Sequence, residues 1–192
     1  VVDIDGAVDM ASTLVVASTI NTVGITGPKS NFTNSILISN DAGTGTLNAA
    51  SNNTGLGFEV FDDLTTADDN VAVGSQAMHK VTTGGANVAI GQLALGTNTT
   101  GTHNIAVGKE ALGANTTSSN NTAVGKTALR QNTTASENTA IGSVSMFSNT
   151  TGTSNTAVGY DSLSTNTTAS NNTAVGRAAL KVNTTGADNV AL

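Results

Sequence analysis

Acidic side chains are the first candidates for chemistry in this sequence. Asp62, Asp63, Asp68 and Asp69 fall in one short stretch, with Glu59 just before them. Carboxylate oxygens are the ligands that Ca²⁺ prefers, so the group is a candidate cation site. It matches neither the EF-hand loop nor the Gly- and Asp-rich calcium-binding repeat. We expect a solvated acidic turn, with a metal site as the alternative.

Two histidines are the other side chains suited to metal binding or proton transfer near neutral pH. His79 and His103 stand more than one repeat apart, and the sequence places no second histidine or carboxylate beside either of them. We expect both to be exposed. The chain also has no Cys, no nucleophile–base arrangement and no phosphate-binding loop. We therefore expect no catalytic residue, no cofactor and no enzymatic activity.

A 17-residue sequence repeat determines the secondary structure in which both histidines lie. A glycine returns at every seventeenth position without a slip, and so does an asparagine four places before it. Self-similarity at a fixed period is typical of a repeat architecture. The glycines are Gly74, Gly91, Gly108, Gly125, Gly142, Gly159 and Gly176, and the asparagines are Asn70, Asn87, Asn104, Asn121, Asn138, Asn155, Asn172 and Asn189. The repeats thus span residues 70–192, as seven copies and a truncated eighth.

Each copy follows the pattern N-[VIT]-A-[VI]-G-x-x-[AS]-[LM]-x-x-N-T-T-x-x-x, for which residues 121–137 are an example. Alternation in the first residues predicts a short strand that ends at Gly125, with Val124 and its β-branched neighbours on one face and Ala on the other. We expect the inward side chains of each coil to be roughly one Val or Ile, one Leu or Met, such as Leu129 of a second short strand, and some Ala. Asn132 and the threonines after it predict a turn, because Asn side chains bond nearby backbone.

Two strands and two turns per copy predict one coil of a parallel β-solenoid, with successive coils about 4.8 Å apart. Stacking would place Asn above Asn and Thr above Thr, and such ladders share hydrogen bonds along the stack. Asn121, Val124, Gly125, Leu129 and Asn132 represent the structural columns expected. The Asn-x-Thr triplets also match glycosylation sites, but a ladder-forming turn explains each copy.

Composition and charge exclude several other classes. Aromatic residues make up 3% of the chain and charged residues 10%, which argues against the large core of a globular enzyme and against a disordered chain. Residues 1–69 carry nine acids and one Lys, a net charge of −8, whereas residues 70–192 carry six bases and four acids, a net charge of +2. The shift indicates a boundary near residue 69. The weak charge and the absence of a long apolar run argue against nucleic-acid binding and membrane insertion.

Residues 1–69 do not share the period, and we expect an intertwined β shaft or connector there. Phe58, Val60, Phe61 and Leu64 are expected to form a small hydrophobic plug where the connector meets the repeats. Within the repeats each coil has few apolar side chains to bury against the entropy of ordering its whole length. We therefore expect several chains to pack about an axis, most simply as a homotrimer.

The motifs "NTAVG", "NVAIG" and "NTAIG" resemble the NSVAIG-type motif of trimeric autotransporter adhesin heads, which form a trimeric left-handed parallel β-roll. The longer stretch "NTAVGYDSLSTNTTASNNTAVGRAALKVNTTG" resembles the repeats of phage tail fibres, notably those of marine cyanophages. The resemblance covers about residues 70–192. The motif has one residue fewer before its Gly than the adhesin motif, and the repeat is longer, which favours the fibre family.

The resemblance implies a structural fibre segment, a rigid trimeric spacer in the virion that supports host-cell attachment. Its partners would be further copies of this chain, other tail or fibre proteins, and a host surface glycan bound through a tip outside this segment. The alternative is an adhesin head or extracellular filament at a cell surface that binds glycan or matrix directly. The residues after each Gly share no chemistry, which favours the spacer. They are Ser75, Gln92, Lys109, Lys126, Ser143, Tyr160 and Arg177.

Overall fold

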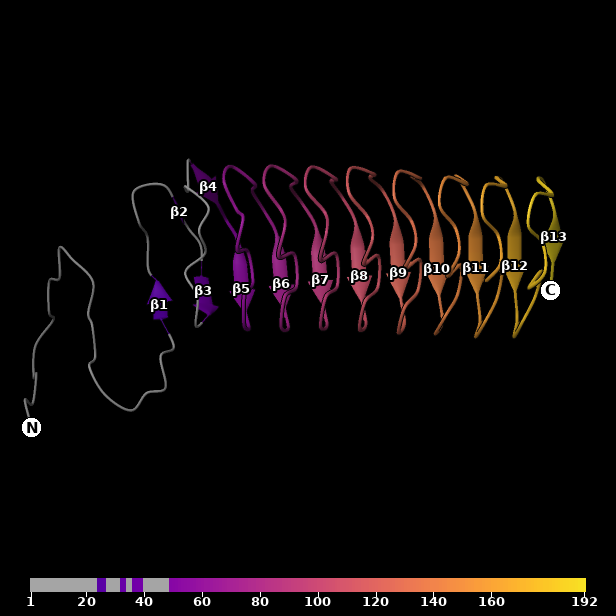
Figure 1. Cartoon of the computed structure of the whole chain (residues 1–192), viewed down its shortest axis with the longest axis horizontal. Helices are drawn as coiled ribbons and strands as arrows, with labels where there is room; N and C mark the ends of the chain where they lie inside the picture. The colour runs from indigo at the N-terminus through magenta and orange to yellow at the C-terminus, as the bar shows by residue number, and fades with distance from the viewer. Residues whose placement is uncertain (1–23, 27–31, 34–35, 40–48) are drawn as a thin grey trace, which may run out of the picture.

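The described strands are short and lie side by side, one after another, along a straight rod (Figure 1). The computed structural model describes residues 24–26, 32–33, 36–39 and 49–192. Within these ranges every regular element is a strand, and no helix is present that could cross a membrane. The predicted fold class is confirmed: the described chain is an all-β parallel solenoid of about eight turns.

One long sheet runs through the whole stack. Its strand order is β1-β3-β5-β6-β7-β8-β9-β10-β11-β12-β13, while β2 and β4 form a separate pair. Among the described strands, only β1 and β3 pair in the antiparallel sense. The strands are β1 (Gly24–Thr26), β2 (Phe32–Thr33), β3 (Ile36–Ser39), β4 (Ala50–Ser51), β5 (Thr54–Leu56), β6 (Val71–Val73), β7 (Val88–Ile90), β8 (Ile105–Val107), β9 (Thr122–Val124), β10 (Thr139–Ile141), β11 (Thr156–Val158), β12 (Thr173–Val175) and β13 (Val190–Ala191).

The regular ladder begins one coil earlier than the boundary expected near residue 69. Thr54 pairs with Val71 at the same 17-residue step that separates all later strands, so residues 53–69 form a coil of the same length. The sequence pattern hides this coil because Phe61 and Leu64 stand where later coils carry Leu or Met and Asn. The shaft expected for the N-terminal segment lies mostly outside the described residues.

Each coil has one strand, so the second strand predicted around the Leu column is wrong. Turns occupy that part of the coil, with positive φ at Gln76 (58°) and Met78 (48°). The N–H of Gln76 donates to the carbonyl of Phe58 in the preceding coil at 2.7 Å, and that of Met78 to Ala94 in the following coil at 3.0 Å. The N–H of Ala77, between them, donates to the Gly74 carbonyl of its own coil at 3.2 Å, so the coil is bonded to both neighbours without a second strand.

The strand residue that points into the coil is the alanine, which we expected there in part, whereas the Val or Ile that we also expected inside points outward. Ala123 and its equivalents are fully buried, whereas Ile90, Ile105 and Ile141 keep 42%, 43% and 41% of their surface exposed. A coil this narrow has room on its strand side for a methyl group only, because the buried Leu129 fills the lumen from the opposite wall. The β-branched side chains therefore face outward.

The hydrophobic plug predicted at the start of the repeats is present in part. Val60, Phe61 and Leu64 are buried and belong to the continuous core of the solenoid, but Phe58 is 46% exposed. Phe58 occupies the position after the glycine of its coil, which points outward in every copy. The plug is therefore the first layer of the core and not a separate element.

A column of glycines allows the coils to stack closely. Gly91 has φ = 131°, and a Cβ built on it would lie 2.7 Å from the carbonyl carbon of Gly108 in the next coil. Both the backbone conformation and the close approach therefore require glycine. The same contact recurs at each later step until the last coil, which explains why this residue shows no variation.

Two ladders of buried asparagines join neighbouring coils, as predicted: the first runs from Asn53 to Asn189 and the second from Asn98 to Asn166. In the first ladder the backbone N–H of Asn138 donates to Oδ1 of Asn121 at 3.0 Å, and Nδ2 of Asn121 donates to the Ala135 carbonyl at 2.9 Å. In the second, Nδ2 of Asn132 donates to Oδ1 of Asn115 at 3.1 Å and to the same Ala135 carbonyl at 2.8 Å. Each coil is thus held internally and registered against the next.

The threonine that follows the second ladder bonds to backbone instead of to another threonine side chain. The hydroxyl of Thr99 donates to the carbonyl of Thr116 in the next coil at 3.1 Å, and the hydroxyl of Thr116 donates to the carbonyl of Thr133 at 3.2 Å. The Asn of each Asn-x-Thr triplet in the inner coils is fully buried, so the ladder accounts for these triplets. Those asparagines are Asn98, Asn115, Asn132, Asn149 and Asn166.

We predict that Asn121→Ala lowers the free energy of unfolding by about 2–4 kcal/mol, because it leaves the buried N–H of Asn138 without an acceptor. Thermal unfolding followed by circular dichroism measures the loss. Asn120→Ala is the matched control: Asn120 is exposed, and its column already contains Ala86 with φ = 56°. Equal destabilisation by the two substitutions would contradict a registering role for the buried asparagines.

Candidate functional site

A hollow on the surface of the described coils, which we call the notch, interrupts the regular pattern. It has a volume of about 510 Å³ and forms where Gly96 and Gly113 stand at the position that holds His79 and Arg130 in nearby coils. Because glycine has no side chain, these two successive coils leave a gap between the side chains of His79 and Arg130. The lining residues are Gln76, His79, Lys80, Leu93, Gly96, Thr97, Glu110, Gly113, Ala114 and Arg130.

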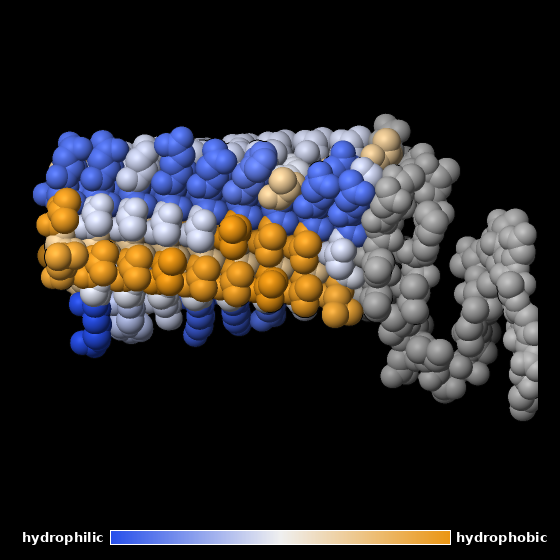
Figure 2. Space-filling model, turned by 180° about the vertical axis from the view of Figure 1, so that it is seen from behind, coloured by the Kyte–Doolittle hydropathy of each residue, from blue (hydrophilic) through white to orange (hydrophobic). Residues whose placement is uncertain are grey.

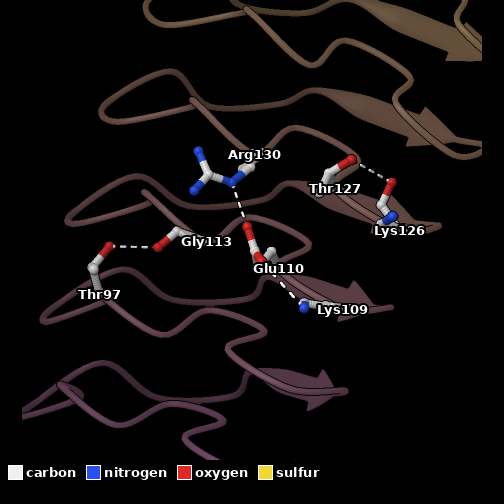
Figure 3. Close-up of polar contacts among 7 residues, drawn as sticks. All are labelled: Thr97, Lys109, Glu110, Gly113, Lys126, Thr127 and Arg130. Atoms are coloured by element: carbon white, nitrogen blue, oxygen red, sulfur yellow. Dashed lines mark hydrogen bonds and ion pairs between the residues drawn. The ribbon is translucent and has the colours of Figure 1, made fainter.

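Glu110 is the centre of charge in the notch (Figure 3). Nε of Arg130 donates to Oε2 of Glu110 at 2.6 Å, and Nζ of Lys109 lies 3.8 Å from Oε1. The hydroxyl of Thr97 donates to the Gly113 carbonyl at 2.8 Å on the floor. The terminal nitrogens of Arg130 point away from Glu110 in Figure 3. The notch therefore presents a guanidinium and a carboxylate to a polar ligand.

The electrostatics of the notch suit ion pairing more than acid–base chemistry. The hydrogen bond from Arg130 lowers the pKa of Glu110 below its ordinary value. On another coil, the hydrogen bond from Lys181 at 2.6 Å lowers the pKa of Asp161 in the same way. Both carboxyl groups stay ionised at neutral pH, whereas a general acid would need a raised pKa.

The structure does not bring the four predicted acidic ligands together. Asp62 lies 3.7 Å from Nδ1 of His79, and Asp63 lies 3.1 Å from Nζ of Lys80. Within the described residues no group of three His, Cys, Asp or Glu side chains is arranged to hold a metal ion. Asp68 accepts hydrogen bonds from the backbone and hydroxyl of Ser51, at 2.7 and 2.9 Å, and Asp69 accepts one from Asn52 at 3.0 Å.

The two histidines differ in their surroundings. His103 is exposed, as expected, but the side chain of His79 is only 18% exposed, and its Nδ1 lies 3.4 Å from the Glu59 carbonyl. His79 forms one wall of the notch. The exposed ring of Tyr160 has the guanidinium of Arg177 5.7 Å from its centroid, so this aromatic is not isolated on the surface.

The feature that the sequence pattern did not predict is an apolar stripe along the outer face of the long sheet, seen in orange in Figure 2. It consists of the first and third residues of each strand from β5 to β12, with Val190 and Leu192 at the last level. These residues point outward because the small residue between them points inward. Five of them are threonines, and the others are the aliphatic side chains that form the orange band. The sequence feature that pointed to this stripe was the alternation of residues in each strand. Alternation defines two unlike faces but does not say which of them is buried. The stripe contains Thr54, Leu56, Val71, Val73, Val88, Ile90, Ile105, Val107, Thr122, Val124, Thr139, Ile141, Thr156, Val158, Thr173, Val175, Val190 and Leu192.

We predict that Glu110 stabilises the fold at neutral pH and that its contribution disappears in acid. A depressed pKa in the folded state gives stability that is present above the ordinary glutamate range and is lost as pH falls through the folded-state pKa. The unfolding midpoint of the wild type should exceed that of Glu110→Gln at pH 7, by an effect below about 1 kcal/mol because the pair is partly solvated. The two midpoints should converge in acid.

The matched background for this measurement is Arg130→Met, in which Glu110 has lost the partner that lowers its pKa. In that background Glu110→Gln should have little effect at any pH. A difference between wild type and Glu110→Gln that stays constant down to strongly acid pH would show that the Arg130 pair is not its cause.

No protein-family model, curated protein or solved structure matches this chain. What the protein does must therefore be inferred from its own residues and geometry.

Proposed function

We propose that this chain is a segment of a phage tail fibre or spike, a rigid homotrimeric spacer that supports attachment to a host cell. The observation that carries the proposal is the constancy of the ladder. From β5 to β13 each strand pairs with the next at one unchanged 17-residue step, without an insertion or a change of direction. A spacer needs this property, because its length is then set by the number of coils.

The contacts between coils also support a stiff rod. The inner junctions combine strand pairing, two buried asparagine ladders, a threonine hydroxyl bonded to the next coil and close glycine contacts. The second ladder joins the coils from Asn98 to Asn166. All of these contacts fix the distance between neighbours at about 4.8 Å, so the eight steps span about 38 Å. Proteins built from such nearest-neighbour contacts lengthen by adding units without a new core.

The surface of the rod favours a supporting role over catalysis. Side chains in the outward columns differ from coil to coil, as in the column after the glycine, where Lys109 and Lys126 are followed by Ser143 and Tyr160. The fold carries the repeat, and function depends on sites placed on the fold. In the proposed assembly the partners are two further copies of the chain and the other fibre proteins, in a virion, with receptor binding located outside this segment.

We predict that removing two whole coils shortens the rod without unfolding it. Deletion of residues 121–154, which is two full repeats, should shorten the particle by about 10 Å and preserve cooperative unfolding. Deletion of residues 121–153 is the control: it shifts the following strands by one residue and turns their outer face inward. Small-angle scattering measures the length. Equal behaviour of the two deletions would contradict the register-locked rod.

The notch favours a second candidate function, a cell-surface adhesin head or filament that binds glycan directly. Its guanidinium, carboxylate and hydroxyl groups surround a hollow large enough for a sugar ring, and the half-buried Leu93 supplies apolar floor. The notch nevertheless occurs at one place along the described coils, where two successive glycines stand, and no described Phe, Tyr or Trp side chain lines it. The spacer therefore remains the leading proposal.

A glycan array separates the two functions. The spacer predicts no bound glycan for residues 1–192, and antibodies against residues 53–192 should label fibres on virus particles from the same source. The adhesin predicts that a defined glycan binds and that antibodies label cell surfaces. The affinity for that glycan should fall at least tenfold in Arg130→Met and should be unchanged in the exposed-site control Thr134→Met. Binding that requires Arg130 would overturn the spacer.

A further inference from the structure

The apolar stripe is large enough to be an interface. Its isoleucines keep about two-fifths of their surface exposed, and the stripe runs without a break along the rod (Figure 2). It extends over nine strand levels, from β5 to β13, whereas one partner contributes about 800 Å² to a standard interface. A continuous patch of this size on a soluble protein marks a binding surface.

The stripe contains no charged residue at any level, and its side chains recur at one strand spacing. A partner that packs against it along its whole length must have ridges with the same period. A second copy of this chain meets that condition, because its own stripe has the same spacing between side chains. A globular partner of unrelated sequence would match only a few levels.

Two columns border the stripe, one with three acidic residues among its eight members and the other with three basic residues among its eight. The residue before each ladder asparagine lies at one end of the strand and is exposed, and the residue after each glycine lies at the other end. Figure 2 shows polar side chains along both borders. We call them the acidic edge and the basic edge. The acidic edge is Asp69, Ala86, His103, Asn120, Glu137, Ser154, Asn171 and Asp188, and the basic edge is Phe58, Ser75, Gln92, Lys109, Lys126, Ser143, Tyr160 and Arg177.

Five charges on these edges lack an ion pair within the described chain. Lys126 and Arg177 are the described Lys and Arg residues without one. On the acidic edge Asp69, Glu137 and Asp188 meet only the neutral side chains of Asn52, Ser154 and Asn171. Four of the five are regularly spaced. Glu137 lies one strand level beyond Lys126, and Asp188 lies one strand level beyond Arg177.

We propose that the stripe is the surface through which copies of this chain associate, parallel and in register, with the basic edge of one copy against the acidic edge of the next. This inference rests on the homotrimer of the proposed function and adds its contact face and direction. In a parallel assembly Lys126 of one copy lies within one strand spacing of Glu137 of its neighbour, and Arg177 is placed likewise beside Asp188. Face-to-face antiparallel packing would instead bring like edges together.

The stripe is tested by the double variant Ile90→Lys with Ile141→Lys. Its matched control is Thr83→Lys with Thr134→Lys, which adds the same charges at exposed positions outside the stripe. Light scattering on a sizing column should give three chains for wild type and control, and one chain for the stripe variant with an unchanged circular dichroism spectrum. A three-chain stripe variant overturns the contact face but leaves the trimer, whereas a one-chain wild type overturns both.

The direction of packing is tested by charge reversal at the edges. This test remains informative even if the double variant Ile90→Lys with Ile141→Lys does not fold. Lys126→Glu alone and Glu137→Lys alone should each weaken association roughly tenfold, and the combined variant should return to within about threefold of wild type. Within one chain the two side chains lie on opposite edges, about 20 Å apart, beyond the screening length. Rescue therefore reports contact between copies. Tighter association of Lys126→Glu, or no rescue, overturns the parallel alignment.

Discussion

The structure depends on one constraint: every coil must sit one strand spacing from the next at the same place along the chain. The buried asparagines impose it, because the Oδ1 of each accepts the backbone N–H of its equivalent in the following coil, as between Asn121 and Asn138. A shift of one residue would bury polar groups without partners, which costs more than any single contact gains. The uniform length and the repeated sequence of the coils follow from this hydrogen bond.

The same constraint limits what the interior can hold. Coils that stack this closely leave a narrow lumen, so Ala123 faces inward from the strand and Leu129 fills the space from the opposite wall. Leu129 adopts φ = 49° to do so, a conformation that costs about 1–2 kcal/mol for a non-glycine residue. Burial of its side chain and the hydrogen bond from its N–H to the Ser145 carbonyl of the following coil offset that cost. The β-branched residues are displaced outward, and this creates the apolar stripe.

A protein whose interior is so repetitive can vary only on its surface, and both proposed surfaces arise there. The notch exists because Gly96 and Gly113 follow one another in a column that elsewhere holds larger side chains. The edges of the stripe differ in charge because Lys126 and Glu137 stand in columns where neither the core nor the ladders restrict the residue. The stripe explains how a thin coil gains further burial, and the edges give the assembly a direction.

The 17-residue period by itself determined the parallel stack, the asparagine ladders and the glycine column, because only in-register stacking gives a reason for Asn121, Gly125 and Asn132 to recur without a slip. Alternation also determined that the strand has two unlike faces. It could not decide which face is buried, since that depends on the width of the closed coil, a property of the tertiary structure. Turn conformation around the Leu column and the extra coil that contains Leu64 were likewise decided by contacts with neighbouring coils. The notch was decided in the same way, because it forms between side chains that stand three repeats apart in the sequence, His79 and Arg130.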